Sequence, residues 1–137
     1  MPNGMAVTSF RRITVFVLAG SLTIGAAFHW IDIYQAGFLP YKAAPLAINI
    51  FWTMLAVVDL LAAYLLVRQR KLGLILTLVI MVMDVGVNSY AAYELDLFSA
   101  FWPLQLQTLF LGFSLGSVGF LWLDRIVMTD KSVHGPI

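Results

Sequence analysis

Four stretches of this sequence are each long and apolar enough to cross a lipid bilayer, and this feature constrains the fold more than any other. A helix needs about 20 mostly apolar residues to cross a hydrocarbon core that is about 30 Å thick. The four stretches cover roughly residues 13–35, 45–67, 72–93 and 99–123. Because lipid cannot hydrogen-bond to an exposed backbone, each stretch is predicted to be a helix.

The segments between these stretches are too short to form a second domain. Residues 37–44 carry a glycine and a proline, which are typical of a turn. Of the 137 residues, 61% are hydrophobic and 11% are charged, whereas soluble domains are about 25% charged. The sequence predicts a single all-α domain over residues 1–137, a polytopic membrane protein that folds as a four-helix transmembrane bundle.

The basic residues predict how this bundle is oriented. Those that fall on one side of it are Arg11, Arg12, Arg68, Arg70, Lys71, Arg125 and Lys131. The other side carries Lys42 together with the acids Glu94 and Asp96. Since Lys and Arg are enriched in cytoplasmic loops, we expect both termini to be cytoplasmic. The expected location is the bacterial cytoplasmic membrane, with the lipid bilayer as the main partner.

A cleaved signal peptide is the alternative for the first stretch, because Gly25, Ala26 and Ala27 resemble a cleavage site. The apolar run continues past Ala27 to the length of a full span, which favours a retained helix.

Charge and composition exclude several function classes. The net charge of +1 gives no basic field for nucleic acid. The chain has no cysteine, which excludes disulfides, thiol catalysis and Cys-ligated metal. His29 and Asp32 are spaced so that they can touch, but zinc requires further ligands. We therefore expect neither a metal nor another cofactor.

Each predicted span carries one face of small and polar residues at helical spacing. On the third span this face comprises Gly73, Thr77, Met81, Asp84, Asn88 and Ala91, and on the second it comprises Asn49, Trp52, Ala56, Asp59 and Ala63. On the first span it comprises Ser21, Gly25, His29 and Asp32, and on the fourth Gln105, Thr108, Gly112, Gly116 and Gly119. Since lipid cannot solvate polar side chains, these faces are predicted to meet at the bundle centre.

Polar groups from all four predicted spans fall in the outer half of the membrane, which predicts a polar pocket that opens outward. The residues predicted to bind a ligand are Asp84, Asn88, Asn49, Gln105, Trp52, Asp59, His29 and Asp32. Among them, Asp59 is expected to lie deeper, nearer the cytoplasmic half.

Asp84 is the strongest single signal, because a carboxyl group near a bilayer centre costs about 2.5–3.5 kcal/mol on insertion scales. No Lys or Arg lies inside any predicted span to neutralise it. Asp84 either contacts a ligand, carries a proton or acts as a general acid or base, or it clamps the helices by hydrogen bonds to Asn49 or Gln105. Asp59 presents the same two alternatives.

Residues 31–40, IDIYQAGFLP, resemble the segment that closes the first helix in the EXPERA group of sterol-handling membrane proteins. The matching positions are Asp32, Gln35, Ala36, Leu39 and Pro40, with spacing that differs by one or two residues. The resemblance implies that a four-helix bundle with buried acids can hold an apolar ligand that has one polar or cationic group. The isomerases of that group also use His and Glu, and the second span here has neither.

Three functions follow as hypotheses. The first is the binding or transport of a small amphipathic, cationic or lipid-like molecule in the outward-opening pocket, with Asp84 as the central group. The second is an intramembrane enzyme, isomerase-like or cyclase-like, that acts on an isoprenoid or sterol-like substrate. The third is a structural role, as a subunit of a larger membrane complex or a homo-oligomer. The sequence does not decide whether the protein is an enzyme.

Overall fold

The computed structural model describes the backbone of residues 4–130 and the side chains of residues 7–122. Lys131, which contributed to the predicted orientation, lies outside the described residues. The helices are α1 (Gly4–Ala36), α2 (Leu46–Arg68), α3 (Arg70–Tyr93) and α4 (Trp102–Asp130). All four are long and apolar enough to cross a membrane. The predicted all-α, four-helix transmembrane bundle is confirmed.

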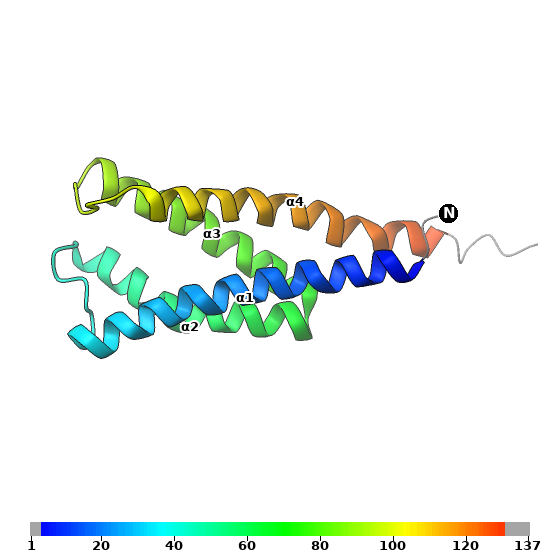
Figure 1. Ribbon diagram of the computed structural model, residues 1–137, viewed down its shortest axis with the longest axis horizontal. Coiled ribbons are helices and arrows are strands. Elements are labelled where there is room, and N and C mark those ends of the chain that lie inside the picture. Colours follow the sequence, from blue (N-terminus) through cyan, green and yellow to red (C-terminus); the bar gives the residue numbers. More distant parts are fainter. Residues whose placement is uncertain (1–3, 131–137) are drawn as a thin grey trace, which may run out of the picture.

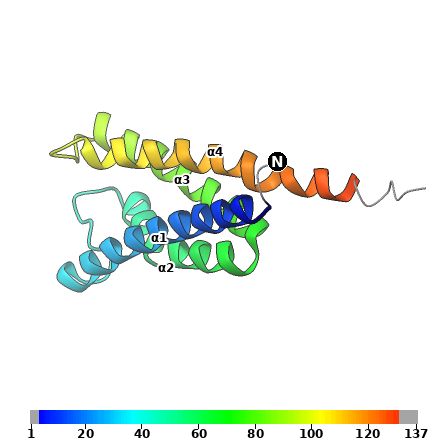
Figure 2. The ribbon, with the colours of Figure 1, turned by 45° about the vertical axis from the view of Figure 1, so that its right-hand side comes forward.

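The helices run side by side along one axis (Figure 1). The α1–α2 and α3–α4 loops lie at one end of the bundle, and the α2–α3 turn lies toward the other, where α1 begins. We call these the loop end and the basic end. α1 packs mainly against α2, α2 against α3, and α3 against α4, whereas α1 and α4 barely touch. Figure 2 shows α4 lying apart from the α1–α2 pair.

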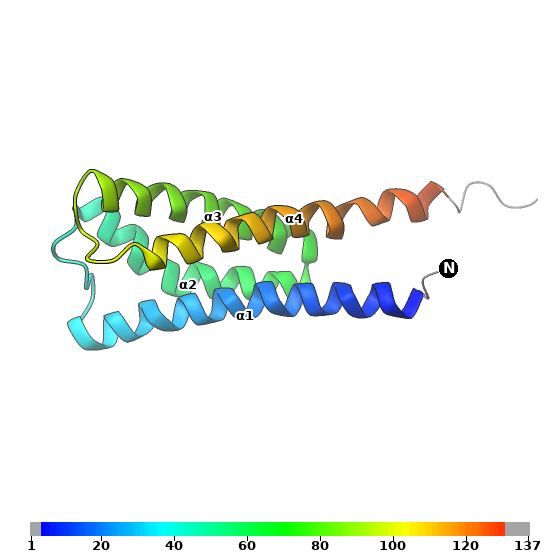
Figure 3. The ribbon, with the colours of Figure 1, turned by 45° about the horizontal axis from the view of Figure 1, so that its top comes forward.

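α1 begins well before the predicted boundary at residue 13, because hydropathy reports only the part of a helix that lies in lipid. The helix continues through Arg11 and Arg12 toward the basic end. Both α1 and α4 extend past the α2–α3 turn (Figure 3). At this end the two helices touch through Phe10 and Phe120, whose ring centroids lie 5.2 Å apart.

The α2–α3 turn is very tight, since Gln69 alone separates the two helices. The Gln69 backbone N–H donates to the Leu65 carbonyl at 2.7 Å, which closes the last turn of α2. Gly73 lies where α3 passes the end of α2. A Cβ at this position would come 2.3 Å from the Leu66 backbone nitrogen. Only glycine permits this approach of the two backbones.

The α1–α2 loop is tied down by one amide side chain. Asn49 accepts a hydrogen bond from the Tyr41 backbone N–H at 3.2 Å and donates to the Leu39 carbonyl at 3.1 Å. Leu39 has a φ of 56°, which is unusual for a residue other than glycine. Asn49 thus holds the loop in a conformation that the backbone alone disfavours.

Candidate functional site

Asn88 is the centre of a hydrogen-bonded network of side chains that joins α2, α3 and α4. The Trp52 indole N–H donates to Asn88 Oδ1 at 2.6 Å. The Asn88 amide N–H₂ donates to Asp84 Oδ1 at 3.0 Å and to Gln107 Oε1 at 2.7 Å. Trp52, Asp84 and Asn88 are all buried. One amide therefore holds three helices, because both its donors and its acceptor are used.

Asp59 differs from Asp84 because it has no such support. It is 6% exposed, and its Oδ1 atom is buried without a hydrogen-bond partner. Its Oδ2 atom lies beside Gly25 of α1, at 3.2 Å from the position that a Cβ would take. A buried oxygen without a partner is rare in folded proteins and costs about 1–3 kcal/mol.

A second polar network lies at the loop end. The Tyr41 hydroxyl donates to Asp32 Oδ2 at 2.8 Å and lies 2.7 Å from His29 Nδ1. Since the hydroxyl has one hydrogen and gives it to Asp32, Nδ1 of His29 must be the donor to the hydroxyl oxygen. Burial, together with the hydrogen bond to Asp32, raises the pKa of Tyr41, which keeps this hydroxyl neutral and donating.

The faces predicted for α2 and α3 are confirmed. Every residue assigned to the polar face of either helix is buried, while Gly86 and Tyr90 point outward. On α1 the predicted face is only half-buried. Its most buried row lies alongside and comprises Thr14, Val15, Leu18, Ala19, Leu22 and Ala26.

The face predicted for α4 is wrong, and the opposite face packs against the bundle. Gln105 and Thr108 are exposed, and an added Cβ at Gly112, Gly116 or Gly119 would meet nothing within 4 Å. The inward face comprises Leu104, Gln107, Ser114, Ser117 and Leu121. Gln107 therefore takes the place in the network that the sequence assigned to Gln105.

Among the eight predicted ligand-binding residues, seven fall into the two networks or beside them. Asp84, Asn88 and Trp52 form the first network, with Asp59 close by. His29 and Asp32 belong to the second, and Asn49 anchors the loop next to it. Gln107 and Tyr41 belong to these networks but are not among the residues predicted from the sequence. The alternative α4 face could have indicated Gln107, but a loop residue such as Tyr41 has no periodicity to mark it.

Within the part of the chain that the structure describes, no three His, Cys, Asp or Glu side chains gather in a way that would hold a metal ion.

No protein-family model matches the chain, and neither a curated protein nor a solved structure matches it.

Proposed function

We propose that the protein binds or transports a small cationic or amphipathic molecule at the buried carboxyl groups of Asp59 and Asp84. The observation that carries the proposal is the Asp59 Oδ1 atom, which is buried in a membrane-spanning helix without a hydrogen-bond partner. Ionisable residues inside a membrane are costly and mark ligand or ion pathways more often than not. A bound cation would supply the partner that Asp59 lacks.

The surrounding charges favour a cation over an anion. The four predicted spans contain no Lys or Arg, so no basic residue within them neutralises either carboxyl group. Asp59 on α2 and Asp84 on α3 are both buried, and a carboxylate in low-dielectric surroundings attracts a cation more strongly than in water. Asp84 Oδ1 already accepts from Asn88. Asp59 is therefore the acid with an unused hydrogen-bond acceptor, and Asp84 adds a second carboxyl group to the site.

In this proposal the polar residues of the two networks orient the ligand and close the site. Trp52 and Asn88 fix Asp84, while Tyr41, His29 and Asp32 form the polar layer at the loop end. We further infer that both termini face the cytoplasm of a bacterial cell, from the basic residues at that end. A ligand would then approach from the outside through the loop end.

The test measures binding of a protonated aromatic amine, 2-phenylethylammonium, whose N–H groups can donate to a carboxylate, to the full-length protein in neutral detergent. Asp59→Asn keeps the shape of the side chain but removes its charge. We expect binding to weaken roughly 10–100-fold, the range for losing a charged hydrogen bond. Asp96→Asn, in the exposed α3–α4 loop, is the matched control and should leave binding unchanged. Wild-type binding by Asp59→Asn would refute the proposal.

A structural role is the second candidate, and the Asp84 network favours it. Trp52, Asn88 and Gln107 engage one another and Asp84 without any ligand. The apolar surface of α4 is also largely exposed, which leaves room for a second subunit in place of lipid. If neither Asp59→Asn nor Asp84→Asn changes cation binding, yet Asp84→Asn changes the oligomeric state in detergent, the structural role is supported instead.

A further inference from the structure

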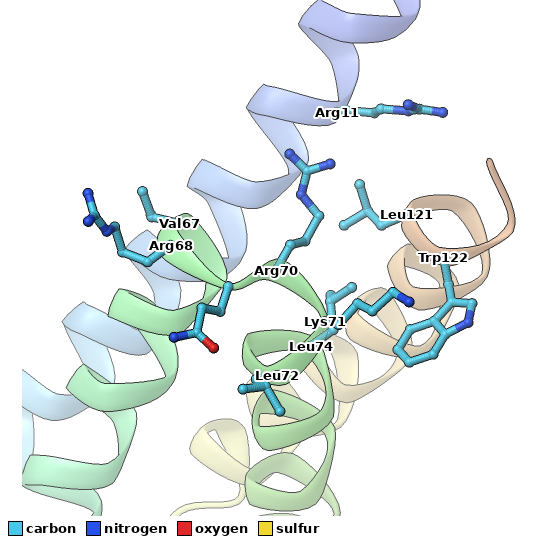
Figure 4. A pocket seen from close by; sticks show the side chains of 10 residues that line it. Arg11, Val67, Arg68, Arg70, Lys71, Leu72, Leu74, Leu121 and Trp122 are labelled. Carbon is cyan, nitrogen blue, oxygen red and sulfur yellow. The ribbon is translucent and has the colours of Figure 1, made fainter. Parts of the chain in front are cut away.

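A cavity of about 600 Å³ lies at the basic end of the bundle, far from the two polar networks. The residues that line it are Arg11, Val67, Arg68, Gln69, Arg70, Lys71, Leu72, Leu74, Leu121 and Trp122. They come from α1, from the end of α2 and the start of α3, and from α4 (Figure 4). The volume falls within the range of about 300–1,000 Å³ that is usual for ligand sites.

Positive charge converges on this cavity from separate helices. In Figure 4, the side chain of Arg70 extends toward Arg11, into the space between α1 and α4, and Lys71 extends toward Trp122. Arg11 is half-buried, so its charge is screened less by water than that of a fully exposed side chain. Among the described side chains, none that line the cavity is acidic. The cavity therefore favours an anion.

Part of the lining is apolar, with Leu121 and Trp122 from α4 and Leu74 from α3. Leu74 and Leu121 are buried there. The Lys71 ammonium lies 5.4 Å from the centroid of the Trp122 ring, and the Arg11 guanidinium lies 5.9 Å from that of Phe120. These cation–π contacts keep the charged groups at the cavity edge.

The position of the cavity identifies the kind of anion. Arg68 ends the membrane-spanning helix α2 and Arg70 begins α3, so the cavity lies where the hydrocarbon core meets the headgroup layer. A free anion would interact with the basic side chains but would leave the apolar part of the lining without a contact. An anionic phospholipid matches both, with its phosphate at the basic residues and its glycerol and first methylenes against Leu121 and Leu74.

We propose that this cavity is a binding site for the headgroup of an anionic phospholipid, held by Arg11 and Arg70 with Lys71 at its edge. The site is separate from Asp59 and Asp84, and it requires no particular orientation of the protein in the membrane. Positive charge at this end of the bundle is expected from membrane topology alone. The test must therefore distinguish binding in this cavity from attraction to basic residues nearby.

The experiment measures the thermal stability of the full-length protein in neutral detergent against increasing phosphatidylglycerol, because a ligand that binds the folded state raises the melting temperature. Phosphatidylcholine and inorganic phosphate are the comparison arms. We expect phosphatidylglycerol alone to stabilise the wild type. Stabilisation by inorganic phosphate to the same extent would show a free-anion site, and equal stabilisation by phosphatidylcholine would show only non-specific lipid contact. Either result overturns the proposal.

The variants are Arg11→Gln with Arg70→Gln, compared with the matched control Arg12→Gln. Arg12 is exposed and does not line the cavity, although it neighbours Arg11 in the sequence. We expect the apparent affinity for phosphatidylglycerol to fall about fivefold for each cavity arginine and about 25-fold for the pair. The Arg12→Gln variant should stay within about twofold of the wild type.

An equal loss of affinity in Arg12→Gln would overturn the proposal, because it would show that only the net charge matters. Should the double variant fail to fold, Arg70→Gln alone keeps the test decisive, since Arg70 is exposed and its replacement leaves no buried group unpaired. If Arg70→Gln binds phosphatidylglycerol with unchanged affinity, Arg70 does not hold the headgroup and the proposed site is wrong.

Discussion

The close approach of α2 and α3 makes Gly73 the position where the smallest substitution should have the largest effect. In Gly73→Ala, the added methyl group would lie 2.3 Å from the Leu66 nitrogen, 2.5 Å from its Cα and 2.6 Å from the Leu65 carbonyl carbon. All three are backbone atoms, so no side chain can rotate to make room. The two helices must move apart near a turn that consists of Gln69 alone.

The magnitude follows from comparison with Gly86→Ala, also on α3, where a Cβ meets nothing within 4 Å. Both variants gain about 1 kcal/mol of helix propensity, which cancels in the difference. What remains is the steric cost of overpacking, about 1–3 kcal/mol. Because the contacts are with backbone, we expect the upper part of this range.

The assay is reversible unfolding in mixed micelles, with both variants and the wild type measured under identical conditions. Gly86→Ala should unfold at or above the wild-type midpoint, and Gly73→Ala should unfold well below Gly86→Ala. If the two variants are equally stable, α2 and α3 do not approach each other as closely as described, and the reasoning fails.

Three further predictions concern α4 and the loop end. Gly116→Leu should change the unfolding free energy by less than about 0.5 kcal/mol, because its Cβ meets open space; a large loss would restore the face predicted from sequence. Gln107→Leu should cost about 1 kcal/mol by removing an acceptor from Asn88, whereas Gln105→Leu should cost nothing measurable in the same melts, and the reverse order would contradict the network. Since the pKa of Tyr41 is raised in the folded state, its contribution to stability is full at lower pH and is lost as pH rises above about 10. Unfolding measured against pH should therefore show a steeper alkaline loss in the wild type than in Tyr41→Phe, and identical profiles would exclude this role.

The sequence determined the number of helices and the inward faces of α2 and α3. Length and hydropathy define a membrane span because lipid excludes an unsatisfied backbone. A carboxyl or amide side chain deep in a span is costly to expose to lipid, and Asp59, Asp84, Asn49 and Asn88 all point inward. Gln105, in the first turn of α4, is the exposed exception. The residues with the largest penalty in lipid were therefore the best guides to the fold.

On α4 the sequence offered two faces of similar polarity, and only packing decided between them. The hydroxyl groups of Thr108, Ser114 and Ser117 each donate to a carbonyl four residues earlier in their own helix. A hydroxyl satisfied in this way can face lipid or protein at little cost. Glycine has no side chain to favour either side, so neither residue type reveals which face is buried.

The tertiary structure also created the contacts that carry the candidate site. Gln105 and Gln107 are chemically identical, and Gln107 is the one that turns inward because Asn88 of α3 lies opposite it. Tyr41 joins His29 to Asp32 because the loop folds back over the end of α1. Gly25 of α1 lies beside Asp59 Oδ2 and has no side chain to offer it, while Asp59 Oδ1 is buried without a hydrogen-bond partner. Each of these relations joins residues on different segments, and the spacing along one helix cannot determine which group a neighbouring segment presents.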